Sequence, residues 1–484
     1  MHKKIVFSVV ARILFVVSAV MLVPLGWAFY DNPASPEVRA FLITILVGSL
    51  ISLLPRIVLR IKKEDFNNLN AKDGLAIVGL SWIVLSLLGA LPLYLTQGVP
   101  TYTDAFFETV SGFTTTGATV LTDVESYSRG ILFWRSLTHW LGGMGIIVLY
   151  LALLPALGQN AFQLYKAEAP GITAERIQPR IKETAKILWL VYFLLSALET
   201  GLLMLGGMSL FEALCHTFGT MATGGFSTRN ASIGAFSPYI QWVVIVFMFL
   251  AGSNFMLHYQ ALCGNLRAYT KSEEFRSYFS LIAILVIFFS LALRTEILGG
   301  GVLRKAAFQV VSILTTTGYV TADFDAWPPI LGFLLVTVMF IGGCGGSTGG
   351  GMKVARVFIA LKVAVRSVIQ AVLPNAVIPV RYDQRPLDNR IIMQVMSYFV
   401  IYIFLFFIGT ILFAFLEKCD IVTALSAAIA TLSNIGPGLG LIGATKNYAW
   451  ISTPGKWLLS FLMLAGRLEL YSILILFSPP TWKK

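Results

Sequence analysis

Charged residues are scarce in this sequence. Only 12% of its 484 residues are Asp, Glu, Lys or Arg, whereas 57% are hydrophobic and the mean hydropathy is +0.78. A soluble domain carries roughly 25% charged residues, so the composition excludes an ordinary soluble protein. It predicts an all-α polytopic membrane protein.

Residues that bind metals or perform catalysis are also few. The chain has four histidines and four cysteines, and the cysteines lie far apart with no CxxC or metal-ligand spacing. We find no Ser/His/Asp set and no pair of catalytic carboxylates, which argues against an enzyme and against an organic cofactor. The net charge of +12 is spread over many loops. It therefore indicates membrane orientation rather than nucleic-acid binding.

Long apolar runs are abundant. A helix needs about 20 apolar residues to cross a bilayer, and ten stretches qualify: 4–30, 38–61, 74–97, 129–156, 183–207, 235–262, 277–297, 327–369, 391–416 and 452–479. The first lacks a convincing cleavage site and is expected to be retained. Most lysines and arginines fall in the segments that would lie inside if the N-terminus is cytoplasmic, so both termini are predicted to be cytoplasmic. The longest loop, around 157–185, is too short for a soluble domain.

A short apolar segment followed by a Gly/Thr-rich stretch occurs four times between these spans. The copies are "YTDAFFETVSGF" with "TTTGATV", "MSLFEALCHTFG" with "TMATGGFST", "KAAFQVVSIL" with "TTTGYVT", and "IVTALSAAIA" with "TLSNIGPGLG". The glycines interpreted as equivalent are Gly117, Gly224, Gly318 and Gly436. Such a recurrence predicts an internal repeat. Ordinary surface loops are the alternative, but four copies on one predicted face disfavour it.

Each short segment is too short to cross the membrane. About 11 helical residues rise only about 16 Å, so the segment must enter and turn back. Non-helical backbone at that depth must be buried in protein or line an aqueous cavity. Glycine permits backbone conformations that aim carbonyls at an axis, and the preceding helix ends there with its negative dipole end. This arrangement predicts a cation pathway. A secondary transporter of an organic solute remains an alternative.

The eighth span contains "GGCGGSTGGGMK" at 342–353. Glycine costs about 1 kcal/mol in a helix interior, so the helix is expected to break there. A phosphate-binding loop would need Gly-Lys-Ser/Thr, whereas Lys353 lies between Met352 and Val354. Close packing of helices through small residues is a second alternative.

Together these motifs and "GRLEL" at 466–470 resemble the Trk/Ktr/HKT superfamily of potassium transporters, especially its bacterial TrkH/TrkG branch. The resemblance implies ten transmembrane helices: two extra at the N-terminus, and four pseudo-symmetric helix–pore loop–helix repeats around one pore. The segments are 1–66 (extension), 67–170 (repeat 1), 171–272 (repeat 2), 273–384 (repeat 3, with the loop 342–353) and 385–484 (repeat 4).

The same resemblance implies how the ion is held. Backbone carbonyls before each filter glycine would coordinate K+ and Rb+, at Thr115, Thr116, Gly117, Ala222, Thr223, Gly224, Thr316, Thr317, Gly318, Asn434, Ile435 and Gly436. A serine at the first of these glycines is associated with sodium transport in related plant proteins. Glycine in all four copies therefore favours potassium, with a sodium-permeable or proton-coupled symporter of the same fold as the alternative.

A gate and partners are implied as well. The intramembrane loop would obstruct the pore below the filter through Gly345, Gly346, Gly349, Gly350 and Lys353, with Arg467 as an electrostatic barrier. The branch resides in the bacterial inner membrane as a homodimer and pairs with a cytosolic, nucleotide-binding TrkA-like subunit.

Several charged residues near these motifs have a second interpretation. For Arg467, a structural ion pair with Glu469 is the alternative to the barrier. Arg135 and His139 are interpreted as structural. Glu108 and Asp104 either attract cations or are solvated loop acids.

Overall fold

The computed structural model describes residues 1–59, 70–145, 181–294 and 301–482. These residues are predominantly helical, and the strands among them are one antiparallel pair, β1 (Arg381–Tyr382) and β2 (Arg385–Pro386). The predicted all-α membrane class is confirmed in this form. The ends of the predicted segments at 66 and 170 lie outside the described residues, and the division of the chain stays a prediction.

Six helical stretches in the described residues are long and apolar enough to cross a membrane. Two pairs of helices that bend sharply at a break raise the number to eight if each pair is one span. Residues 146–156 of the predicted span 129–156 lie outside the described residues. The total of ten therefore remains a prediction.

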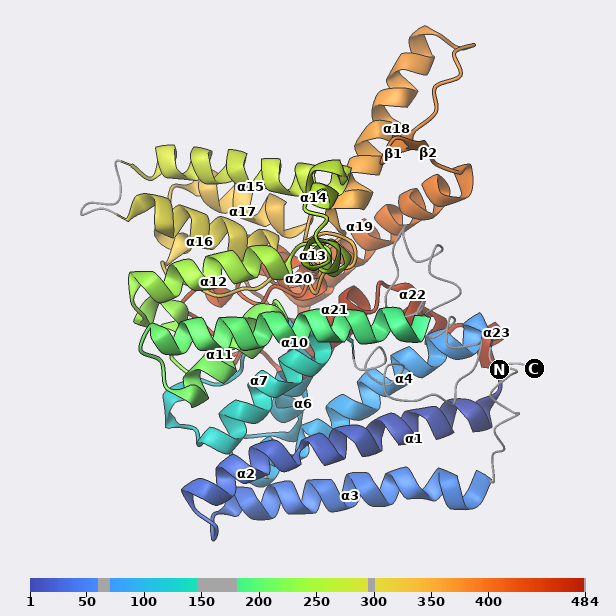
Figure 1. Cartoon of the computed structure of the whole chain (residues 1–484). Coiled ribbons are helices and arrows are strands. Elements are labelled where there is room, and N and C mark those ends of the chain that lie inside the picture. Colours follow the sequence, from blue (N-terminus) through green and yellow to red (C-terminus); the bar gives the residue numbers. More distant parts are fainter. Residues whose placement is uncertain (60–69, 146–180, 295–300, 483–484) are drawn as a thin grey trace.

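The N-terminal part consists of α1 (Lys3–Val20), α2 (Leu22–Asp31) and α3 (Pro36–Leu59). Helix α1 packs between α3 and α4 (Ala71–Gly89), which continues into α5 (Leu91–Leu95). These long helices run roughly side by side, and both chain termini lie at the same side of the bundle (Figure 1).

In the described residues from 70 on, one order of elements occurs four times, with other elements between: a long helix, a short helix, a loop, a 3-10 turn and a further helix. The long helices are α4, α10 (Ile181–Leu205), α15 (Glu273–Ala292) and α19 (Asn389–Glu417). The short helices are α6 (Tyr102–Phe113), α11 (Leu210–Met221), α16 (Val302–Leu314) and α20 (Ile421–Leu432). The turns are η2 (Val124–Ser126), η5 (Ser232–Ala235), η6 (Phe324–Ala326) and η7 (Gly440–Ile442). The helices that follow are α7 (Arg129–Gly143), α12 (Pro238–Ala251), α17 (Pro329–Met339) and α21 (Thr453–Arg467).

Side-chain caps fix where three of the short helices begin. Thr101 and Asp104 form a capping box at α6, Ser209 accepts a hydrogen bond from the Glu212 N–H at α11, and Asp420 accepts one from the Thr423 N–H at α20. Such caps satisfy the free N–H groups of a first helical turn. The caps therefore help to fix the residue at which each of these helices begins.

The glycine-rich segment breaks the helix where the sequence predicts. Helix α17 ends at Met339 and α18 (Val354–Val372) begins after the segment, in which Gly342, Gly346 and Gly351 have positive φ. Lys353 also has φ +73°, a conformation that side chains rarely adopt. Helix α18 then extends away from the bundle beside the β1–β2 hairpin (Figure 1).

Two spans that we expected to be single helices are bent. Helices α12 and α13 (Phe255–Leu262) meet at 100°, and the chain continues through α14 (Arg267–Lys271). Helix α21 meets α22 (Tyr471–Leu474) and η8 (Ile475–Phe477) at 120°, before α23 (Pro479–Trp482). The second bend has a local cause, because Glu469 and Leu470 take positive φ values of 50° and 63°. These residues give no sequence signal for a bend, since neither is Gly or Pro.

Close packing of α7 on α6 depends on a glycine, which yields a test of the fold. A Cβ at Gly142 would lie 1.9 Å from the Phe113 carbonyl oxygen, whereas a Cβ at Gly201 of α10 meets nothing within 4 Å. Gly142→Ala should lower the free energy of unfolding by about 1–3 kcal/mol or more, because the added methyl group overpacks the contact. Gly201→Ala should leave it unchanged or raise it by up to about 1 kcal/mol through helix propensity. Thermal unfolding of the purified variants in detergent measures both, and equal melting temperatures would contradict the packing described here.

Candidate functional site

The four short helices end in loops that share one backbone conformation. We name them loop 1 (114–117), loop 2 (222–225), loop 3 (315–318) and loop 4 (433–436). The second residue of each has positive φ although it is not glycine: Thr115, Thr223, Thr316 and Asn434. The fourth residue is a glycine with positive φ: Gly117, Gly225, Gly318 and Gly436.

Hydrogen bonds confirm the equivalence of these positions. In each loop the N–H of the third residue donates to a carbonyl five residues earlier, in the pairs Thr116–Ser111, Gly224–Gly219, Thr317–Ser312 and Ile435–Ala430. This pattern is the usual way to end a helix with a left-handed residue. The second copy therefore aligns on Gly225 and not on Gly224, and our predicted register for that copy was wrong by one residue. The adjacent glycines of "TGGF" concealed the shift.

Each loop glycine packs against a backbone carbonyl of the next loop. A Cβ at Gly117 would lie 2.2 Å from the Gly224 oxygen, and one at Gly225 would lie 2.2 Å from the Thr317 oxygen. A Cβ at Gly318 would lie 1.8 Å from the Ile435 oxygen, and one at Gly436 would lie 2.5 Å from the Thr116 oxygen. The contacts run from loop 1 to loop 2, 3, 4 and back to loop 1. We call this closed set of contacts the ring.

The ring brings together oxygen atoms and the negative ends of helices. Its four contacting carbonyls belong to the third loop residues, directly after the carboxyl ends of α6, α11, α16 and α20. Among the described residues, no group of three or more His, Cys, Asp or Glu side chains is placed to hold a metal ion. The oxygen donors that the site offers to a cation are therefore mainly uncharged carbonyls, which suit a weakly hydrated ion.

A hollow opens on one side of the ring. Its volume is about 160 Å³, and its lining includes the four equivalent glycines Gly117, Gly225, Gly318 and Gly436. Gly225 lines this hollow together with the other three, in agreement with the corrected register.

The glycine-rich loop (342–353) lies against loops 2, 3 and 4, and none of its residues lines the hollow. Thr348 Oγ1 donates to the Met221 carbonyl at 3.0 Å, beside loop 2. The Gly350 N–H donates to Thr316 Oγ1 at 2.6 Å in loop 3. A Cβ at Gly350 would lie 2.2 Å from the Ser433 oxygen of loop 4. Gly349 makes the corresponding close approach to the Thr315 carbonyl.

Arg467 completes the contacts of this loop. Its guanidinium donates to the Thr348 carbonyl at 2.5 Å and to the Gly142 and Gly143 carbonyls at 2.6 Å. Thus Arg467 joins the glycine-rich loop to the carboxyl end of α7. Lys353 donates to the Gly349 carbonyl within the loop itself. Glu469 forms its ion pair with Arg356 of α18, which disfavours the alternative that it serves as the structural partner of Arg467.

The other predicted gate glycines occupy the far end of the same loop. Gly345 donates its N–H to Glu274 of α15 at 2.6 Å, and Gly346 accepts a hydrogen bond from the Phe255 N–H through its carbonyl. These two glycines therefore anchor the loop to α15 and α13, whereas Gly349 and Gly350 contact the loops of the ring.

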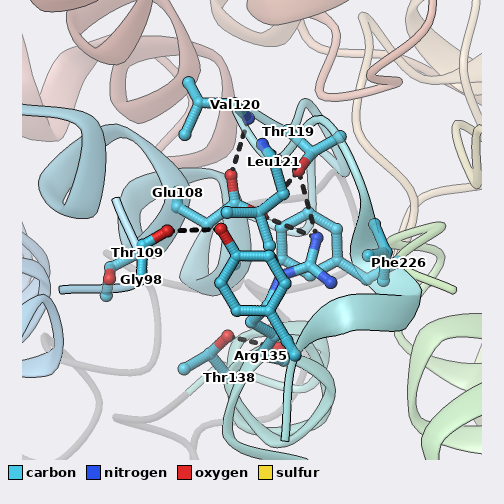
Figure 2. Close-up of polar contacts among 12 residues, drawn as sticks. Gly98, Glu108, Thr109, Thr119, Val120, Leu121, Arg135, Thr138 and Phe226 are labelled. Carbon is cyan, nitrogen blue, oxygen red and sulfur yellow. Dashed lines mark hydrogen bonds and ion pairs between the residues drawn. The ribbon is translucent and has the colours of Figure 1, made fainter. Parts of the chain in front are cut away.

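Two acids that we considered as solvated loop residues are buried and paired. Glu108 forms an ion pair with Arg135, and Asp104 forms one with Lys456 at 2.6 Å. Their side chains are 7% exposed or less. Figure 2 shows Glu108 and Arg135 together with Thr119 and Val120, the residues that follow loop 1. These pairings could not be predicted from the sequence, because each joins residues from different elements.

Comparisons with known proteins agree with this architecture. Residues 42–484 match the family model described as TrkH, cation transport protein. The "Trk system potassium uptake protein TrkH" of Halomonas elongata is 40% identical over 494 residues, and that of Escherichia coli K12 is 38% identical over 493 residues. The alignments cover 100% of each chain. The crystal structure of the potassium transporter TrkH from Vibrio parahaemolyticus superimposes with a TM-score of 0.89 at 35% identity, with 100% of both chains covered.

The helical fold and these relatives define an integral membrane transport protein, and the relatives' names imply transport rather than enzymatic activity. The chain belongs to the TrkH family of cation transport proteins.

The ring predicts a sharp difference between two glycines of the same loop region. Gly225 combines a φ of +80° with a Cβ position 2.2 Å from the Thr317 oxygen, whereas a Cβ at Gly234 makes only ordinary contacts from 3.5 Å. Gly225→Ala should abolish cation flux in proteoliposomes, because the backbone strain and the overlap together displace the loop. Gly234→Ala should retain wild-type flux. Equal flux in two variants that elute identically on gel filtration would contradict the role of the ring.

Proposed function

We propose that this chain is the pore-forming subunit of a potassium uptake system in the bacterial inner membrane. Four pseudo-symmetric repeats surround one pore, and the carbonyls of the four loops coordinate K+ or Rb+ after it loses its water. The observation that carries this proposal is the closed ring of glycine–carbonyl contacts. The curated names of full-length relatives, which are potassium uptake proteins, support the choice of ion.

The corrected register refines the predicted ligands. Carbonyls at Thr115, Thr116, Thr316, Thr317, Asn434 and Ile435 serve loops 1, 3 and 4. In loop 2 the equivalent carbonyls are those of Thr223 and Gly224, whereas Ala222 is the helix-capping position that matches Thr114. Backbone ligands tolerate this diversity of side chains, since every residue type supplies the same carbonyl.

The glycine-rich loop is proposed to act as the gate. It blocks the path below the ring through contacts with loops 2, 3 and 4, and Arg467 places a positive charge beside it. A fixed positive charge near a narrow path repels a cation. Movement of the loop together with Arg467 would open the path.

We further propose ten spans with both termini in the cytoplasm, a homodimer and a cytosolic nucleotide-binding regulatory subunit. Helix α18 supports the dimer. It carries Leu361, Val365, Val368 and Val372, each more than half exposed, at alternating spacings of four and three residues. This spacing is typical of a seam between two helices, and α18 projects from the bundle (Figure 1). A second copy is the occupant that this seam fits.

A flux experiment tests the proposal. Purified protein in proteoliposomes should take up 86Rb+, and excess K+ should compete more strongly than excess Na+. Gly117→Ser should reduce the preference for K+ over Na+, because a side chain at this position meets the Gly224 carbonyl. Uptake that is indifferent to K+, or a Gly117→Ser variant with unchanged ion preference, would contradict the filter. Uptake driven by an imposed pH gradient would favour the proton-coupled alternative.

A further inference from the structure

Helix α7 presents two polar side chains, Arg135 and His139, toward loops 1 and 2. Neither residue belongs to the ring, and sequence reasoning assigned them no function. Arg135 is 3% exposed and His139 is fully buried. A buried guanidinium in a membrane protein is costly unless paired. Its partner, Glu108, lies on α6 directly behind loop 1.

Glu108 holds the chain where it leaves loop 1. Its carboxylate accepts hydrogen bonds from the Val120 N–H at 2.8 Å and from Thr119 Oγ1 at 2.9 Å. Arg135 donates to the same carboxylate through Nε at 2.8 Å and to Thr119 Oγ1 at 3.2 Å. Figure 2 shows these contacts converging on the two residues. Hydrogen bonds to ionised groups are about twice as strong as neutral ones, so this segment is firmly fixed.

The same helix fixes loop 2 through Phe226, the residue after Gly225. The Arg135 guanidinium lies 4.0 Å from the centre of the Phe226 ring, and the His139 ring stacks on that ring with centroids 4.1 Å apart. His139 Nδ1 lies 2.7 Å from the Gly112 carbonyl, and Nε2 accepts the Phe226 N–H at 3.3 Å. Since a carbonyl only accepts and an N–H only donates, these partners assign the proton to Nδ1. Arg135 and His139 therefore join α6, loop 1 and loop 2.

In two other copies, the residue equivalent to Glu108 also forms a hydrogen bond to the segment that follows the loop. Nine residues before the loop glycine stand Glu108, His216, Gln309 and Ala427. His216 Nε2 bonds Ser227 Oγ at 3.0 Å, and Gln309 Nε2 donates to the Ala322 carbonyl at 3.3 Å. In three copies, then, this position holds the segment beyond the loop. Copy 1 does so with an ion pair.

We propose that Glu108, Arg135 and His139, which we call the brace, are positioning residues that set the ion preference of the ring. They act through loops 1 and 2, whose contact at Gly117 and the Gly224 carbonyl is one quarter of the ring. This inference rests on the proposed function. A carbonyl ring distinguishes K+ from Na+ only while its dimensions are held, and the brace holds the segments on both sides of that contact.

The test measures the K+ to Na+ permeability ratio of reconstituted protein from reversal potentials. Glu108→Gln preserves the shape of the side chain and removes the negative charge to which Arg135 and the Val120 N–H donate hydrogen bonds. It should lower the ratio by about tenfold, which corresponds to about 1.4 kcal/mol. Arg135→Lys keeps the positive charge but loses the Nε contact, so its ratio should fall between those of the wild type and Glu108→Gln.

The matched control is a second buried ion pair, which joins α6 to α21. Asp104 and Lys456 lie near the amino end of α6, where Asp104 caps the helix and Lys456 donates to the Ala449 carbonyl. The double variant Asp104→Asn, Lys456→Gln should keep the wild-type permeability ratio even if its melting temperature falls. A fall in its ratio equal to that of Glu108→Gln would show that general loss of stability explains the effect, and would overturn the proposal.

Two further variants separate the possible failures. If Glu108→Gln does not fold, Phe226→Leu is the decisive variant. It removes the contacts of Arg135 and His139 with the Phe226 side chain and leaves no buried charge unpaired. The K+ to Na+ permeability ratio of this variant should fall. Folded Glu108→Gln or Phe226→Leu protein with a wild-type ratio would overturn the brace. If Gly117→Ser changes the permeability ratio in that case, the proposed filter is supported and only the role of the brace is contradicted. If Gly117→Ser leaves the ratio unchanged as well, the proposed filter is also contradicted.

Discussion

The contact between a glycine of one loop and a carbonyl of the next is the constraint on which the rest of the structure depends. At four places the space left for a Cβ is 2.5 Å or less from a carbonyl oxygen. These approaches require glycine, and together they join the four loops in a closed set. The caps that start three of these helices and the left-handed residues that end all four serve this requirement. The glycine at 142 serves it too, since it brings α7 against the end of α6.

Electrostatics follows from the same geometry. The ring gathers uncharged oxygens and the carboxyl ends of helices, both of which favour a cation. Around it, the charged side chains of Glu108, Arg135, Asp104 and Lys456 are buried in pairs. Pairing keeps these charges from acting as isolated charges in a medium of low polarity. Arg467 donates hydrogen bonds to backbone carbonyls of the glycine-rich loop and of α7, so its guanidinium lies beside the glycine-rich loop.

Much of this arrangement could be predicted from the sequence, because it depends on motifs within single short segments. The short apolar segments with their Gly/Thr loops predicted the short helices, and the run 342–353 predicted a broken helix. The register of loop 2 could not be read, since either glycine of Gly224–Gly225 satisfies the pattern and only φ distinguishes them. The bends after Ala251 and Arg467 were missed, as were the partners of Glu108 and Asp104. The pairings of Glu108 and Asp104 join different elements, for which a single sequence has no periodic signal. The bend after Arg467 comes from positive φ values at Glu469 and Leu470, neither of which is Gly or Pro.

The central claim is that the four loops hold a cation between them. Anomalous diffraction from crystals grown in Rb+ or Tl+ tests it most directly. We expect an anomalous peak enclosed by the carbonyls of Thr116, Gly224, Thr317 and Ile435, which weakens when K+ replaces the heavier ion and persists when Na+ is added. A ring without such a peak, in crystals that show ordered density for all four loops, would contradict it.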